Sequence, residues 1–203
     1  MLDKQMRYAK ESVLNPLARW VGNHISPTEI TLLGGLVGIT AAGFAWQGWY
    51  LAGLVLWIAN RILDGLDGTV ARLNNKQTDL GGYIDIIVDN IVYAVVPIGL
   101  ALSVDTSITY LALIFMLGIF YVNSASWMFL SSIMEKRAQG ANKSGEMTSV
   151  TMVDGLIEGT ETIIFYSLFF LLPQFMGLLF IIMGSLVIVT IVQRLHWAYH
   201  NLD

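Results

Sequence analysis

Residues 50–104 read YLAGLVLWIANRILDGLDGTVARLNNKQTDLGGYIDIIVDNIVYAVVPIGLALSV, and this stretch decides the fold. Each half is long enough for one membrane-crossing helix, and a short polar turn at Asn74 separates the two. The first half becomes polar toward its end, and the second is polar at its beginning. Helices joined by a short turn run antiparallel, so the two polar halves should face each other.

The composition of the whole chain agrees with a membrane location. Of its 203 residues 55% are hydrophobic and 13% are charged, and the mean hydropathy is +0.63. This balance excludes the ordinary surface of a soluble domain. Cysteine is absent, which excludes disulfides, thiolate catalysis and cysteine-ligated metal sites. The first 26 residues are charged and have no continuous apolar core, so we expect no cleaved secretory signal.

The predicted fold class is an all-α integral membrane protein with six transmembrane helices, preceded by an amphipathic interfacial helix at residues 3–23. Glycines recur in the first span at positions 34, 35, 38 and 43, which favours close approach of a neighbouring helix. One membrane domain, residues 1–203, is expected. Its spans are predicted at about 27–47, 50–73, 79–104, 107–135, 150–171 and 174–196.

The basic residues predict the orientation. All eleven lysines and arginines fall on one side of this map, and the opposite connections near 47–49, 104–107 and 172–174 contain none. The positive-inside rule therefore places both termini and the polar halves on the cytoplasmic side, in what we expect to be a prokaryotic cell membrane.

Four aspartates lie in the polar halves. Asp64 and Asp67 are three positions apart, and Asp85 and Asp89 are four apart, so each pair occupies one face of its helix. With a rise of about 1.5 Å per residue, Asp67 and Asp85 should lie at similar depth, with the other two a turn deeper. Four such charges in a bundle repel by several kcal/mol. Hard divalent cations, Mg²⁺ or Mn²⁺, would offset them.

Residues 64–89 are similar to the signature of the CDP-alcohol phosphotransferase family, D-x-x-D-G-x-x-A-R-x8-G-x3-D-x3-D, at every fixed position. The resemblance implies two divalent ions held by Asp64, Asp67 and Asp85, with Asp89 as general base and a further candidate ligand. It also implies a homodimer. The residues it implies for CDP binding are Gly68, Ala71, Arg72 and Gly81.

The reaction implied is transfer of a phosphoalcohol group, favoured here to be phosphatidyl, from a CDP-alcohol such as CDP-diacylglycerol to a hydroxyl acceptor, with release of CMP. One substrate would be a lipid, and no nucleic acid is expected as a partner. The alternative within the family is a small CDP-linked alcohol as donor and a diacylglycerol-type lipid as acceptor.

Glu158 and Glu161 lie near the cytoplasmic start of the predicted fifth span. They could line the acceptor side of the same cavity, or they could pair with Lys136, Arg137 or Arg194. A phosphorylated acceptor needs cationic partners, whereas this region is acidic. The sequence therefore favours an uncharged or cationic acceptor such as serine, a polyol, choline or ethanolamine.

Two other classes of protein are alternatives. Intramembrane carboxylates also mark ion pathways, so a divalent-cation transporter is an alternative. A transporter should carry polar groups through the full membrane thickness, whereas the half opposite the aspartates is apolar. A family relative that has lost catalysis is the third hypothesis, and the complete set of four aspartates speaks against it.

Overall fold

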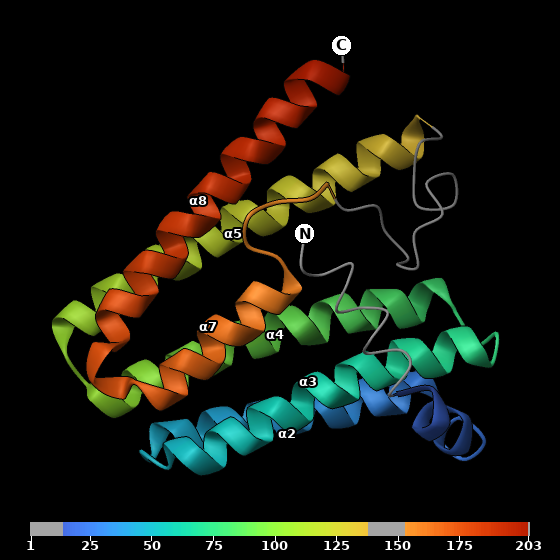
Figure 1. Cartoon of the computed structure of the whole chain (residues 1–203), viewed down its shortest axis with the longest axis horizontal. Coiled ribbons are helices and arrows are strands. Elements are labelled where there is room, and N and C mark those ends of the chain that lie inside the picture. The colour runs from blue at the N-terminus through green and yellow to red at the C-terminus, as the bar shows by residue number, and fades with distance from the viewer. Residues whose placement is uncertain (1–13, 138–152, 203) are drawn as a thin grey trace.

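The computed structural model describes residues 14–137 and 153–202, and within these ranges it contains helices and no strands (Figure 1). Residues 14–21 are helical and belong to the predicted interfacial helix, whose residues 3–13 lie outside the described ranges. The later elements are α2 (Pro27–Trp46), α3 (Tyr50–Leu73), α4 (Asp79–Val104), α5 (Ser107–Lys136), α7 (Gly159–Leu171), the short 3-10 helix η1 (Pro173–Phe175) and α8 (Met176–Asn201).

Four of the described segments are long and apolar enough to cross a membrane, namely α2, α4, α5 and η1 with α8. The predicted all-α membrane class is therefore confirmed, while the count of six spans stays a prediction. Helix α3 has 24 residues, but its second half is charged. Helix α7 has 13 residues and so reaches only about 20 Å of the roughly 30 Å needed.

The described helix that falls in the predicted fifth span begins later than expected. We predicted a span at about 150–171, whereas α7 begins at Gly159 and residues 153–158 are not helical. The physical reason is local, because Glu158 is extended and its backbone N–H donates to the Glu161 carboxylate. Helix α8 continues to Asn201 rather than stopping at 196, since a helix need not end at the membrane surface.

The helices form two groups joined by α7 (Figure 1). Helix α2 packs against both α3 and α4, and α5 packs against α8. Helix α7 contacts α3, α4 and α8, and buried aromatic rings fill this junction. Trp57 of α3 stacks on Tyr166 of α7 at 4.9 Å, and Phe169 meets Phe180 of α8 edge-on, also at 4.9 Å. The α3–α4 hairpin is thus held from one side by α2 and from the other by α7.

Small residues set the distance between α2 and α4. A Cβ atom on Gly99 would collide with the backbone oxygen of Ala42, and one on Gly38 would lie 2.7 Å from Val92. The glycine pattern of the first span therefore does allow close packing, except at Gly43, where a Cβ would meet nothing within 4 Å.

Gly99→Ala should destabilise the protein by about 1–3 kcal/mol, because the added methyl collides with a backbone oxygen that cannot move alone. Thermal unfolding in detergent measures the change. Gly118→Ala is the matched control, since a Cβ there meets nothing within 4 Å, and its melting temperature should stay the same or rise. Equal melting temperatures for the two variants would show that α2 and α4 are not in close contact.

Candidate active site

A buried arginine joins the two helices of the hairpin. Arg61 of α3 is 5% exposed, and its Nη2 donates to Oδ1 of Asp89 on α4 at 2.8 Å. Its Nη1 donates to the hydroxyl of Tyr93 at 2.8 Å and lies 3.8 Å from Oδ2 of Asp64. One guanidinium therefore brings Asp64 and Asp89 to the same level.

The arginine is held by its surroundings. Its guanidinium carbon lies 4.9 Å from the ring centre of Trp57 and 4.8 Å from that of Tyr93. Its Nε donates to the side-chain oxygen of Asn60, whose amide nitrogen donates to the Gly34 carbonyl of α2. The Tyr166 hydroxyl of α7 donates to the Tyr93 carbonyl at 2.6 Å. Three neighbouring helices thus fix the position of this charge.

Asp67 is the most buried of the four aspartates, with 4% of its surface exposed. Its Oδ2 accepts a 2.6 Å hydrogen bond from the Thr31 hydroxyl of α2, and its Oδ1 accepts from the backbone N–H of Gly68. The charges of Asp64 and Asp89 both act on this carboxylate. Three aspartates from two helices therefore share one neighbourhood.

The remaining predicted site residues lie along the same end of the hairpin. Asp85 is half-buried, one helical turn before Asp89 on α4. Gly81 donates its N–H to the Thr78 hydroxyl at the start of α4. A Cβ on Gly68 would meet the Arg72 guanidinium at 3.2 Å, so this glycine leaves room for that side chain. Ala71 and Arg72 are both half-buried.

The chemistry of this donor set fits divalent metal ions. All the candidate ligands are carboxylates, and Arg61 offsets only part of their charge. In the part of the chain that the structure describes, no three carboxylate or imidazole groups converge closely enough to count as a metal site. Two of the candidate ligands, Asp64 and Asp89, contact Arg61.

Glu158 and Glu161 lie at the start of α7, where they cap the helix. Oε1 of Glu158 accepts from the backbone N–H of Gly155 at 2.9 Å, and Glu161 accepts from the N–H of Glu158 at 3.2 Å. Arg194 of α8 is 6% exposed, and its charge acts on Glu158. Its Nη1 donates to Asn123 of α5 and its Nε donates to the Val153 carbonyl.

The capping contact predicts how two substitutions at Glu161 differ. Glu161→Ala should lower stability by about 1 kcal/mol, because the Glu158 N–H loses its acceptor. Glu161→Gln should melt close to the parent, since glutamine can fill the same position of a cap. Thermal unfolding of both variants in detergent tests this, and equal losses for the two would contradict a capping role.

Sequence reasoning missed two partners of the aspartates, Thr31 and Tyr93. Tyr93 lies four positions after Asp89, on the same face of α4, so its helical spacing was a usable signal. Thr31 lies in another helix, 36 positions before Asp67, and no spacing rule connects the two. The Trp57 ring forms one wall around Arg61.

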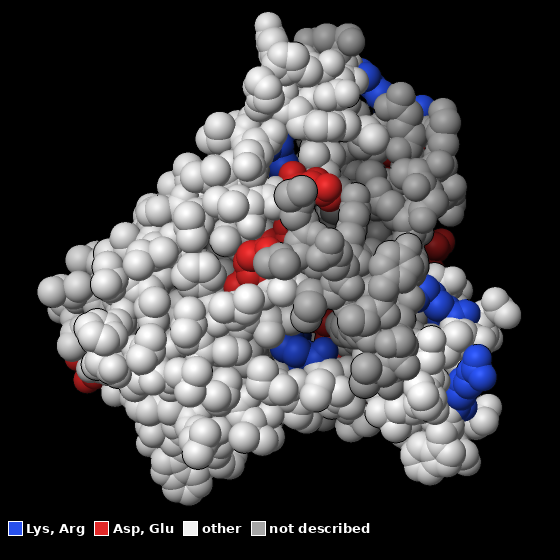
Figure 2. All heavy atoms as spheres, in the orientation of Figure 1, with Lys and Arg blue, Asp and Glu red and all other residues white. Residues whose placement is uncertain are grey.

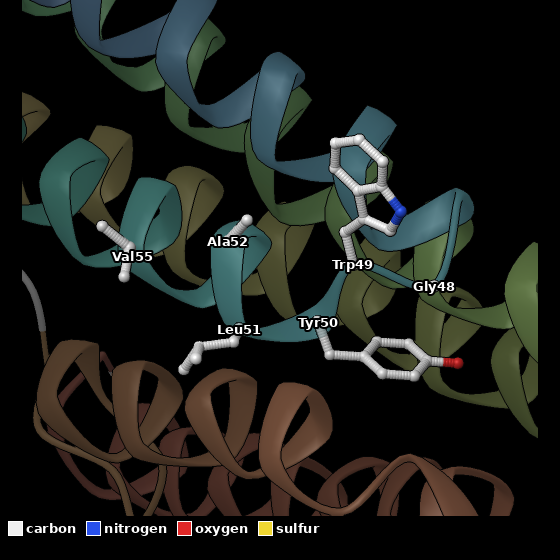
Figure 3. A pocket seen from close by; sticks show the side chains of 6 residues that line it. All are labelled: Gly48, Trp49, Tyr50, Leu51, Ala52 and Val55. Carbon is white, nitrogen blue, oxygen red and sulfur yellow. The ribbon is translucent and has the colours of Figure 1, made fainter.

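The surface carries an acidic area and, apart from it, an apolar groove. Figure 2 shows acidic side chains gathered near the middle of one face, with basic side chains beside them. A groove at the opposite end of α3 is almost wholly apolar (Figure 3), and its lining residues are Gly48, Trp49, Tyr50, Leu51, Ala52 and Val55. Val55 precedes Asp64 by nine positions, about 13 Å along the helix, so this groove is separate from the carboxylates.

Both the sequence and the fold are similar to those of known proteins. The family model described as CDP-alcohol phosphatidyltransferase matches residues 24–193. An inner membrane protein of Escherichia coli (strain K12), YnjF, is 34% identical over 203 residues, which is 100% of this chain and 97% of that protein. The CDP-diacylglycerol–serine O-phosphatidyltransferase of Mycobacterium bovis is 39% identical over 79 residues, 39% of this chain and 28% of that enzyme.

Among solved structures, the phosphatidylinositol phosphate synthase of Mycobacterium tuberculosis shares the fold. Its crystal structure with CDP-DAG bound has a TM-score of 0.66 at 21% identity and covers 91% of this chain and 92% of that one. Its structure with manganese and citrate has a TM-score of 0.65, also at 21% identity, and covers 92% and 88%. The family model spans most of the sequence and YnjF matches its full length, so this chain belongs to the CDP-alcohol phosphatidyltransferase family and is a membrane transferase of phospholipid biosynthesis.

Proposed function

We propose that this enzyme transfers a phosphatidyl group from CDP-diacylglycerol to a hydroxyl acceptor and releases CMP. The observation that supports this best is the contact of Asp64 and Asp89 with Arg61, with the buried Asp67 nearby, within a complete family motif. Charged groups at this depth of a helical bundle are costly and are retained for function. The M. tuberculosis synthase with CDP-DAG bound supports the choice of donor.

In the proposed reaction Asp89 is the general base. Asp89 accepts the proton of the acceptor hydroxyl, the hydroxyl oxygen forms a bond to the β-phosphorus of the donor, and the bond from that phosphorus to the CMP oxygen breaks. Two divalent ions, Mg²⁺ or Mn²⁺, held by Asp64, Asp67, Asp85 and Asp89, would stabilise the charge that develops on the phosphates and on CMP. The manganese-bound neighbour supports this choice of cofactor.

The CDP part of the donor is proposed to bind along the turn of the hairpin. Gly68, Ala71 and Gly81 carry little or no side chain there, which would let the nucleotide approach the backbone. Arg72 would contact the phosphates, since its guanidinium already lies beside Gly68.

The membrane arrangement is part of the proposal. Six spans require α3 and α7 to cross as well, with α3 packed against α2 and α7 and with α7 extended by η1. Both termini and the active site would then face the cytoplasm, as the basic residues predict. A homodimer is proposed from the family resemblance.

For the acceptor we propose an uncharged or cationic alcohol. The acidic start of α7 supports this, and so does Arg194, whose buried guanidinium already donates to Asn123 and to the Val153 carbonyl. Glu161→Gln keeps the cap and removes the negative charge, so it tests whether this charge contributes to binding of the acceptor. The KM for a cationic acceptor should rise in this variant while the KM for the donor stays the same.

Release of CMP by the purified protein tests the proposed function. The protein is given CDP-diacylglycerol, Mn²⁺ or Mg²⁺, and serine, glycerol, choline, ethanolamine, glycerol phosphate or inositol phosphate as acceptor. We expect CMP with one of the unphosphorylated acceptors. CMP formed only from CDP-choline or CDP-ethanolamine with diacylglycerol would replace the donor assignment, and CMP from no combination would refute the proposed function.

A further inference from the structure

Arg61 lies outside the family motif that begins at Asp64, yet its guanidinium makes three side-chain hydrogen bonds in the site. A buried charge is costly unless its surroundings compensate for it. Here the compensation is extensive, because each of the three guanidinium nitrogens donates to a different side chain and two aromatic rings flank the group. Packing alone therefore does not explain why a charged side chain is buried at position 61.

The contacts of Arg61 fall into two sets. One set holds the arginine, and it consists of Asn60, Trp57 and Tyr93. The other set is held by the arginine, and it consists of Asp89 at 2.8 Å and Asp64 at 3.8 Å. Asn60 and Tyr93 are themselves tied to α2 and α7, so the guanidinium has a fixed position against which Asp89 is aligned.

We infer that Arg61 is a positioning residue, which fixes the orientation of the Asp89 carboxylate through Oδ1 and offsets part of the negative charge of Asp64 and Asp89. This inference rests on the proposed function, in which Asp89 acts as the base. Correct alignment of a catalytic group is worth large factors in rate, and a misplacement of about 1 Å can cost about 100-fold.

Lysine could not replace this arginine fully. A guanidinium is planar, donates in several fixed directions and stacks on aromatic rings, whereas an ammonium group is a compact point charge. Lysine at position 61 would keep the positive charge but would lose the simultaneous contacts with Asn60, Tyr93 and Asp89.

The test compares Arg61→Gln and Arg61→Lys with the parent. In Arg61→Gln we expect kcat to fall about 100-fold with little change in the KM for CDP-diacylglycerol, because alignment rather than binding is lost. Arg61→Lys should recover part of the lost kcat. Tyr93→Phe removes only the hydroxyl that accepts from Nη1 of Arg61, so it should lower kcat less than either substitution of Arg61 does.

A second measurement needs no substrate. The rise in melting temperature caused by Mn²⁺ should be at least as large in Arg61→Gln as in the parent, because a positive charge that opposes the metal has been removed. Arg194→Gln is the matched control for loss of a buried arginine, and its response to Mn²⁺ should equal that of the parent.

Each outcome decides between the hypotheses. A parent-like kcat in Arg61→Gln would overturn the positioning role, and so would loss of the Mn²⁺ response together with kcat, since Arg61 would then only maintain the fold. Should Arg61→Gln fail to fold, parent-like kcat in both Arg61→Lys and Tyr93→Phe would overturn it. Absence of CMP release from the parent would instead refute the proposed function, and the Mn²⁺ response would still test the charge effect of Arg61.

Discussion

Asp89→Asn should reduce acceptor-dependent CMP release by roughly 10²–10⁴-fold, the range expected when a general base is removed. Asparagine has the same shape, and its side-chain oxygen can still accept the 2.8 Å hydrogen bond from Nη2 of Arg61. It cannot take a proton from the acceptor hydroxyl. The variant therefore removes the proposed chemistry while it keeps the contact between α3 and α4.

The matched control for this prediction is Asp105→Asn. Asp105 is an exposed aspartate in the left-handed conformation (φ 49°) at the end of α4, far along the helix from Asp89, and asparagine tolerates that conformation. CMP release by Asp105→Asn should equal that of the parent. CMP release by Asp89→Asn within a few-fold of the parent would exclude Asp89 as the base and leave its contact with Arg61 as its role.

The hairpin and the aspartate faces could be predicted because both depend on local spacing. A helix places residues three and four positions apart on one face, so the pairs in α3 and α4 follow from the sequence alone. The polar turn near Asn74 then reverses the chain, so that side chains of the two helices, Arg61 and Asp89, meet. The level shared by Asp64 and Asp89 follows from the same rise per residue.

The contacts between helices could not be predicted in the same way. Thr31 reaches Asp67 and Tyr166 reaches Tyr93 only because α2 and α7 pack on the hairpin in one particular register. That register depends on close approach at positions such as Gly99, which a glycine count cannot locate. The first residue of α7 could not be predicted either. Acidic residues that cap a helix look the same in the sequence as acidic residues within a helix.

Removal of divalent ions should abolish CMP release, and Asp67→Asn should raise the Mn²⁺ concentration needed for half-maximal release by at least about tenfold. Asp67 is the most buried of the proposed ligands, and its two oxygens are already oriented by Thr31 and by the Gly68 N–H. Asparagine keeps an acceptor for Thr31 but loses the charge that would hold the metal. Chelation with EDTA followed by titration of Mn²⁺ measures both effects.

Thr31→Val separates metal binding from packing at this position. It removes the hydroxyl that donates to Oδ2 of Asp67 at 2.6 Å but leaves the carboxylate in place. We expect a loss of stability of about 1–3 kcal/mol and a smaller rise in the Mn²⁺ requirement than in Asp67→Asn, because the charged ligand remains. If Asp67→Asn also needed no more Mn²⁺ than the parent, Asp67 would not be a metal ligand. Its burial against α2 would then be structural, and the metal would have to be held by the other aspartates.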